Sequence, residues 1–119
     1  MTVVDTIVGT DVSYVIDPQP IPALPVRGAK ALFPVHRIYC VGRNYADHAI
    51  EMGHDPNREP PFFFQKNPDN LLQNGEFPYP DATKDVHYEI EMVVALAKGG
   101  RDIPIERAMD CVYGYGVGL

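Results

Sequence analysis

Proline is the residue that most limits how this chain can fold. The 119 residues include twelve prolines, and many of them fall in two stretches, residues 18–25 and 56–68. A proline ring fixes φ and removes the backbone N–H, which excludes proline from helix interiors and from central strands. Both stretches are therefore predicted to be extended or turning connections, and regular elements are expected elsewhere in the chain.

The composition is that of one small globular domain. The hydrophobic fraction is 45% and the charged fraction 22%, both ordinary values for a folded protein. The net charge of −6 argues against nucleic acid and anionic membranes as partners, because both bind basic surfaces. The sequence contains no apolar run of membrane-spanning length and no signal-peptide pattern at its start. We therefore expect a cytoplasmic protein.

A mostly β fold of the α+β class is predicted. Residues 37–42 form an apolar run that ends in glycine, which indicates a buried strand with a sharp exit. Two short helices are expected at residues 44–53 and 105–110, the second opened by Pro104. Turns are expected at Asn67-Pro68-Asp69-Asn70 and at Asn74-Gly75. Further strands are predicted at residues 3–16 (one or two), 61–66, 86–97 and 112–119.

Two cysteines, Cys40 and Cys111, lie far apart in apolar runs. They form no Cys-x-x-Cys unit, so a zinc ribbon and a redox motif are both excluded. Buried reduced thiols are expected.

The segment Glu89-Ile90-Glu91 is the most informative for chemistry. In a strand, side chains alternate between faces, so Glu89 and Glu91 would point the same way. Two adjacent carboxylates repel each other beside a buried region and need a proton or a cation between them. A hard divalent cation such as Mg²⁺ or Ca²⁺ fits oxygen ligands. The alternative is a strand whose solvated face carries two glutamates.

His48 and Glu51 are spaced i, i+3 on the expected helix, so they share one face. A carboxylate beside an imidazole orients the ring and raises its basicity, which suits a general base that activates water. The alternative is an ordinary surface pair. His36, His54 and His87 have no partner at a helical spacing and stay unassigned.

Three weaker candidate site residues lie at the end of a predicted strand or directly after it. Lys66 ends an aromatic strand, where its ammonium could stabilise a developing negative charge; a lysine whose charge reaches solvent is the alternative. Arg43 and Asn44 follow Gly42 at a strand exit, where ligand-binding residues concentrate, although helix capping explains Asn44 equally well. The pattern Gly114-x-Gly116-x-Gly118 has the wrong spacing for a nucleotide-binding loop.

Four segments occur in the order found in one known family. The sequence resembles the fumarylacetoacetate hydrolase family over residues 37–119, and residues 1–36 form a variable, proline-rich N-terminal region. The segments that carry the resemblance are Tyr39-Cys40-Val41-Gly42-Arg43-Asn44-Tyr45-Ala46-Asp47-His48, Pro61-Phe62-Phe63-Phe64-Gln65-Lys66, His87-Tyr88-Glu89-Ile90-Glu91 and Tyr113-Gly114-Tyr115-Gly116-Val117-Gly118-Leu119.

The resemblance implies a fold and a set of roles. Residues 37–119 would be the N-terminal part of a catalytic domain with a mixed β-sheet and β-roll fold. Glu89 and Glu91 would be two of three carboxylate ligands to Mg²⁺ or Mn²⁺, with Ca²⁺ also possible, and the third would be an aspartate directly after the position of Leu119.

The same resemblance extends to the other candidate residues and to assembly. His48 and Glu51 would activate water, and Lys66 would hold the substrate or an oxyanion. Arg43 and Asn44 remain substrate-binding candidates. Family members usually pair, so a homodimer is expected.

The implied reaction is metal-dependent hydrolysis of a carbon–carbon bond in an acylpyruvate. The stretch of residues 58–66 most resembles fumarylpyruvate hydrolases of gentisate breakdown, so the expected substrate is a small oxo-acid, fumarylpyruvate, which would yield fumarate and pyruvate. Two alternatives stay open. One is decarboxylation of oxaloacetate or isomerisation of an oxo-acid by the same fold, and the other is a non-catalytic fragment.

Overall fold

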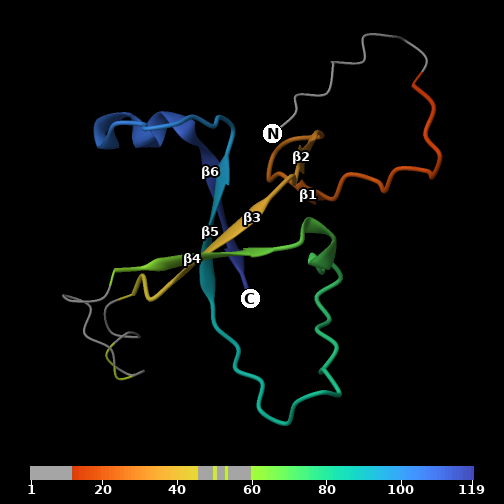
Figure 1. Cartoon of the computed structure of the whole chain (residues 1–119), viewed down its shortest axis with the longest axis vertical. Coiled ribbons are helices and arrows are strands. Elements are labelled where there is room, and N and C mark those ends of the chain that lie inside the picture. Colours follow the sequence, from red (N-terminus) through yellow and green to blue (C-terminus); the bar gives the residue numbers. More distant parts are fainter. Residues whose placement is uncertain (1–11, 46–49, 51–52, 54–59) are drawn as a thin grey trace. The chain divides into compact units, whose positions relative to one another are not determined.

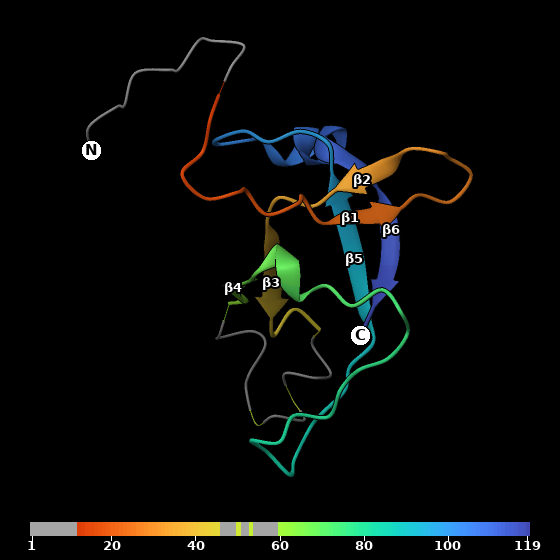
Figure 2. The same ribbon diagram turned by 90° about the vertical axis from the view of Figure 1, so that its right-hand side faces the viewer.

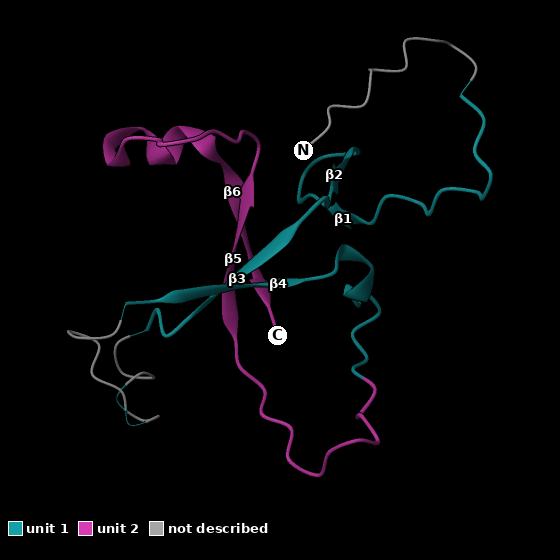
Figure 3. Ribbon diagram, in the orientation of Figure 1, with its two compact units in different colours: residues 1–77 teal, residues 78–119 magenta. Residues whose placement is uncertain are grey.

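The computed structural model describes residues 12–45, 50, 53 and 60–119 of the chain. The chain divides into two units, residues 1–77 and 78–119, which Figure 3 colours teal and magenta. Six strands pair within the described residues as three two-stranded antiparallel ladders, β1–β2, β3–β4 and β5–β6, labelled in Figure 1. Strands outnumber helices among the described residues, which confirms the mostly β fold class.

The first ladder lies in the proline-rich region. Strand β1 (Ala23–Pro25) pairs with β2 (Leu32–Pro34), as Figure 2 shows. Sequence reasoning predicted only connections here. Two prolines fit because each strand has a single paired neighbour, so it has a free edge where no N–H is required. Next to the ladder, Val35 donates its backbone N–H to the Pro22 carbonyl at 2.7 Å. Val35 is 8% exposed and is the one buried hydrophobic residue among those that the structure describes.

The second ladder confirms two predicted strands. Strand β3 (Ile38–Gly42) pairs with β4 (Phe62–Lys66) in a register that places Gly42 opposite Phe62 and Ile38 opposite Lys66. The prediction that β3 is buried is wrong for this chain, because Tyr39 is 59% exposed and Val41 43% exposed. Exposure alternates along β3, with Ile38, Cys40 and Gly42 half-buried, so only one face of the strand is partly covered.

Turns follow β4 where they were expected. The 3-10 helix η1 (Pro68–Asn70) begins directly after Asn67. Asn74 accepts a hydrogen bond from the Glu76 N–H through its side-chain Oδ1 at 3.2 Å. Gly75 has a φ of 75°, a left-handed conformation that glycine adopts without a steric cost.

The unit of residues 78–119 contains the third ladder. Strand β5 (Glu91–Leu96) pairs with β6 (Val112–Gly118), and the register shifts between Ala95 and Leu96. The 3-10 helix η2 (Ile105–Cys111) directly precedes β6, with Pro104 as its N-cap. This confirms the predicted helix position and the predicted last strand.

The predicted strand over residues 86–97 is too long. Glu91 pairs with Gly118, the last residue of β6, so no β6 residue pairs with the residues before Glu91. Just before the predicted strand, the Asp85 N–H donates to the Thr83 hydroxyl at 3.1 Å. The apolar run 92–97 was also expected to be buried, yet Met92 is 62% exposed.

The remaining predictions concern the N-terminal strands, the first helix and the cysteines, and the described residues test only part of them. Residues 12–16 form no strand, and the remainder of the predicted N-terminal strands lies outside the described residues. Most of the predicted helix at 44–53 also lies outside them. Cys40 and Cys111 are free thiols, as expected, although both are half-buried rather than buried. Among the described residues, none belongs to a helix long and apolar enough to cross a membrane. The proposed boundary after residue 36 stays a prediction.

Candidate active site

Arg43 occupies an unusual backbone conformation at the exit of β3. Its φ is 61°, in the left-handed region that side chains other than glycine rarely adopt. Such conformations concentrate at binding and catalytic sites, where the surrounding structure holds them. The guanidinium carbon of Arg43 lies over the Phe62 ring, 5.4 Å from its centroid, within cation–π range. Asn44, which follows it, is exposed.

The Phe62 ring can take this place because the residue opposite it has no side chain. Gly42 is the direct partner of Phe62 in the β3–β4 ladder. A Cβ added to Gly42 would collide with the far edge of the Phe62 ring. Phe62 also stacks on Phe64, with 5.9 Å between ring centroids and an interplanar angle of 29°. Phe62 therefore contacts both Arg43 and Phe64, and we call these three residues the Arg43 stack.

Lys66 shares this face, because alternate residues of a strand point the same way. It lies four residues beyond Phe62 on β4 and pairs with Ile38, so its Cα is about 13 Å along the strand from that of Phe62. Its side chain is exposed. Arg43 and Lys66 thus belong to opposite ends of one ladder.

The predicted water-activating pair, His48 and Glu51, lies outside the described residues. The structure therefore leaves this pair as a prediction. The ladder ends at Gly42 and Phe62, on either side of the segment that contains the pair.

Glu91 begins β5 opposite Gly118, and the pairing register explains the glycine pattern of β6. Val93 and Ala95 share a face with Glu91, and their β6 partners are Gly116 and Gly114. The three alternate glycines therefore lie on the face that carries the Glu91 carboxylate. A Cβ on Gly118 would lie 3.0 Å from a Val93 methyl, so at that position even alanine would be crowded. These glycines keep the face flat beside a carboxylate, and they need no nucleotide to explain them.

The prediction that Glu89 and Glu91 point the same way assumed that both lie in one strand. Only Glu91 lies in β5, because Glu89 precedes the strand. Both glutamates are exposed within this chain. Just before them, His87 Nε2 lies 3.1 Å from Asp85 Oδ1. Sequence reasoning missed this pair because it searched helical spacings, whereas the i, i+2 spacing in an extended segment was the available signal.

The donor set determines which cation fits. Two carboxylates two residues apart supply oxygen donors, which suit a hard divalent ion. The described residues contain no group of three or more His, Cys, Asp or Glu side chains that could hold a metal ion. The carboxylate oxygens of Glu89 and Glu91 suit two positions of such a site, and their role as metal ligands stays a prediction.

Comparison with known proteins places these features in a family. The sequence profile named fumarylacetoacetate (FAA) hydrolase C-terminal matches residues 37–119, which include β3 to β6. The chain belongs to the fumarylacetoacetate hydrolase family. The match includes both glutamates, the Arg43 stack and Lys66.

Solved and curated relatives show a range of activities within this family. A crystal structure of fumarylpyruvate hydrolase from Pseudomonas aeruginosa, in complex with Mn²⁺ and pyruvate, is 49% identical with a TM-score of 0.84 over 88% of this chain and 47% of that chain. A mitochondrial oxaloacetate decarboxylase from Dictyostelium discoideum is 43% identical over 70% of this chain and 38% of its own length. A mitochondrial oxaloacetate tautomerase from Arabidopsis thaliana is 37% identical over 70% of this chain and 37% of its own length.

The chain spans about half of the solved relative and under two-fifths of these curated relatives. Relatives that are 37% to 49% identical include a hydrolase, a decarboxylase and a tautomerase, so membership in the family leaves the reaction of this chain open.

The predicted metal ligands can be tested without turnover. In the purified protein that carries this chain, Mn²⁺ at about 100 times its Kd should raise the free energy of unfolding by about 2.7 kcal/mol, because only the folded state holds the ion. Glu91→Gln keeps the size of the side chain and removes its charge, so it should abolish most of this gain, as measured by the melting temperature with and without Mn²⁺.

Glu76→Gln is the matched control, since Glu76 is exposed in a turn outside β5, and it should keep the full gain. If Glu91→Gln is stabilised by Mn²⁺ as strongly as the unmutated protein, Glu91 is not a ligand.

Proposed function

We propose that the protein carrying this chain hydrolyses the carbon–carbon bond of an acylpyruvate, with fumarylpyruvate as the substrate. The observation that carries this proposal is the 49% identical fumarylpyruvate hydrolase bound to Mn²⁺ and pyruvate. Pyruvate is one product of such a hydrolysis. The cations of the β3–β4 ladder support the same substrate, because fumarylpyruvate has a carboxylate at each end.

In this proposal, Glu89 and Glu91 are two of the ligands of Mn²⁺ or Mg²⁺. When bound, the cation supplies Lewis acidity that polarises the carbonyl groups of the substrate. The carboxylates of Glu89 and Glu91 would hold the cation in place and partly neutralise its positive charge.

His48, oriented by Glu51, takes a proton from water in the proposed reaction. The water oxygen bonds to the fumaryl carbonyl carbon. The bond from that carbon to the neighbouring methylene carbon then breaks, and its electron pair stays with the three-carbon fragment as the enolate of pyruvate. The Lys66 ammonium offsets the charge of this enolate. Protonation of the methylene carbon gives pyruvate, and the other product is fumarate.

A second reaction is favoured by the curated relatives. The Dictyostelium protein is an oxaloacetate decarboxylase, and the Arabidopsis protein is an oxaloacetate tautomerase. Both reactions proceed through an enolate next to a carboxylate, so the same carboxylates and lysine suit them. They do not require water to attack a carbonyl, and they would leave the pair His48 and Glu51 without its proposed task.

The substrate proposal predicts loss of fumarylpyruvate absorbance when the purified protein is supplied with Mn²⁺. Removal of the metal with a chelator should stop this loss, and restored Mn²⁺ should recover it. Oxaloacetate, followed in a parallel assay, should be converted more slowly. Conversion of oxaloacetate with no turnover of fumarylpyruvate would replace the hydrolase proposal with the second reaction.

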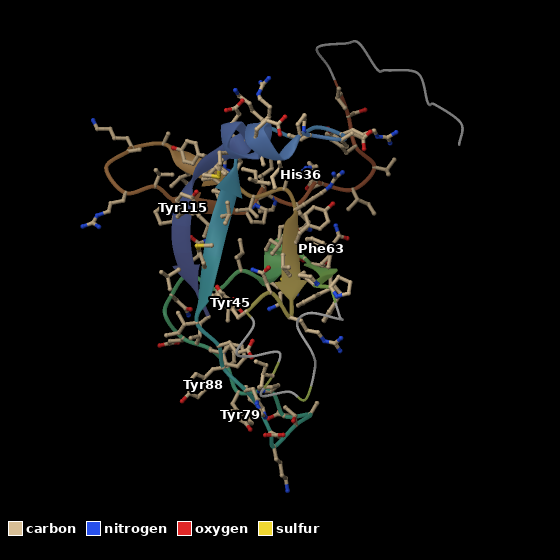
Figure 4. All side chains as sticks on the ribbon, turned by 90° about the vertical axis from the view of Figure 1, so that its left-hand side faces the viewer. His36, Tyr45, Phe63, Tyr79, Tyr88 and Tyr115 are labelled. Atoms are coloured by element: carbon tan, nitrogen blue, oxygen red, sulfur yellow. The ribbon has the colours of Figure 1, made fainter. Side chains whose placement is uncertain are left out.

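The proposed base predicts a selective loss of rate. His48→Ala should lower kcat by about 100-fold to 10,000-fold, the range for removal of a general base, and should keep the stabilisation by Mn²⁺. His36→Ala is the matched control, because His36 is an exposed histidine outside the β3–β4 ladder, labelled in Figure 4. A His48→Ala variant with a near-normal rate would show that another group activates the water.

A further inference from the structure

Residues 97–111 connect β5 to β6 and include η2, and we call them the basic connection. The unit of residues 78–119 contains four basic and seven acidic side chains, so its net charge is negative. Three of the four basic residues nevertheless line a single pocket of about 340 Å³ within the basic connection, and these are Lys98, Arg101 and Arg107. This volume is at the lower end of the range for small-molecule sites, so it suits a small ligand.

The backbone that carries these cations is closed by a hydrogen bond between its two ends. Ala97, directly after β5, donates its N–H to the carbonyl of Cys111, the last residue of η2, at 2.9 Å. Between them, Asp102 has a φ of 50°, a left-handed conformation that side chains other than glycine rarely adopt. The Ile103 side chain lies against Gly100, where an added Cβ would be 2.9 Å from its Cδ1 atom. Such backbone conformations cluster at ligand sites, which makes this connection a candidate site.

One of the three cations already has an acidic partner. Arg107 donates from Nε to Asp110 Oδ2 at 2.6 Å, and Asp110 also lines the pocket. A guanidinium has five N–H donors, and in the described part of the chain the two terminal nitrogens of Arg107 make no further hydrogen bond. Asp102 is the other acidic lining residue. The lining therefore has an excess of positive charge, and a bound anion would offset the mutual repulsion of the three cations.

We propose that the basic connection binds a small oxyanion, a phosphate or a carboxylate group, through Lys98, Arg101 and Arg107. An oxyanion accepts several charge-assisted hydrogen bonds at once, from the ammonium of a lysine and from the planar N–H groups of an arginine. Figure 1 shows η2 at the end of the ladder where β5 ends, and the two ends of β5 are about 17 Å apart along the strand. The pocket is therefore remote from Glu91, and binding there requires neither the metal nor the proposed reaction.

Phosphate binding can be followed at one backbone amide of the pocket. The purified protein that carries this chain is labelled with heavy nitrogen in its glycines and titrated with inorganic phosphate in the presence of a chelator. Sodium chloride keeps the ionic strength constant, so a surface that merely attracts anions gives little response. Gly99 lines the pocket, and Gly99→Ala assigns its signal, because an added Cβ there meets nothing within 4 Å. The Gly99 signal should shift saturably, with a Kd in the millimolar range expected for exposed cations.

Variants of the lining cations connect this shift to the pocket. Arg101→Gln should raise the Kd by about 1.5-fold to 5-fold, the size of one exposed charge pair, and Lys98→Gln together with Arg101→Gln should raise it further. Lys84→Gln is the matched control, since Lys84 is the exposed cation of the same unit that does not line the pocket, and its Kd should equal that of the unmutated protein.

Two results would overturn the proposal. One is the absence of a saturable Gly99 shift in the millimolar range. The other is a Kd that stays unchanged in the double variant, because the anion would then bind elsewhere. If the double variant does not fold, the two single variants carry the test, together with Arg101→Lys, which retains the charge and should bind phosphate more tightly than Arg101→Gln.

A parallel titration with malonate, a small dicarboxylate, distinguishes the two sources of an oxyanion. Tighter binding of phosphate than of malonate would identify a phosphate group as the ligand, and the reverse order would identify a carboxylate. Either order supports an oxyanion site, provided that the lining variants weaken the binding. No substrate is present in these titrations, so their outcome is independent of whether the protein turns over fumarylpyruvate.

Discussion

Antiparallel pairing of short strands is the constraint on which the rest of this structure depends. Among the described residues only the Val35 side chain is a buried apolar one, and the regular structure of these residues consists mainly of the three ladders. In a paired strand, successive side chains point to opposite faces of the ladder, so every second residue lies on the same face. On β3–β4 it collects Gly42, Phe62, Phe64 and Lys66 on one face. On β5–β6 it aligns Glu91 with the glycine-lined face of β6.

Each of these two faces, taken by itself, carries charged candidate residues beside glycines. Glycines lack the side chains that would crowd those residues. On the first ladder, Gly42 admits an aromatic ring, and that ring supports Arg43. On the second, glycines at alternate positions of β6 leave the Glu91 face flat. The relatives described above are named for fumarylpyruvate or oxaloacetate, both of which are small oxo-acids.

The sequence was sufficient where a local pattern determines the structure. The aromatic run 62–66, the apolar run ending at Gly42, the proline before η2 and the turn at Asn74-Gly75 all predicted their elements correctly. The sequence was insufficient where the pairing strand determines where an element begins or which side chains meet. Strand β5 begins at Glu91 because β6 ends opposite it, and no local property of residues 86–90 shows this. The Arg43–Phe62 contact joins residues nineteen positions apart through a register, which a single sequence without its pairing does not specify.

Hydrolysis is the central claim, and the fate of the water oxygen tests it most directly. The protein is supplied with fumarylpyruvate and Mn²⁺ in water labelled with heavy oxygen, and the products are analysed by mass spectrometry. Hydrolysis predicts that the new fumarate carboxylate contains one labelled oxygen from water, in equal yield with pyruvate. Carbon dioxide as a product, or fumarate without the label, would contradict the account and indicate that the chain supports a different oxo-acid reaction.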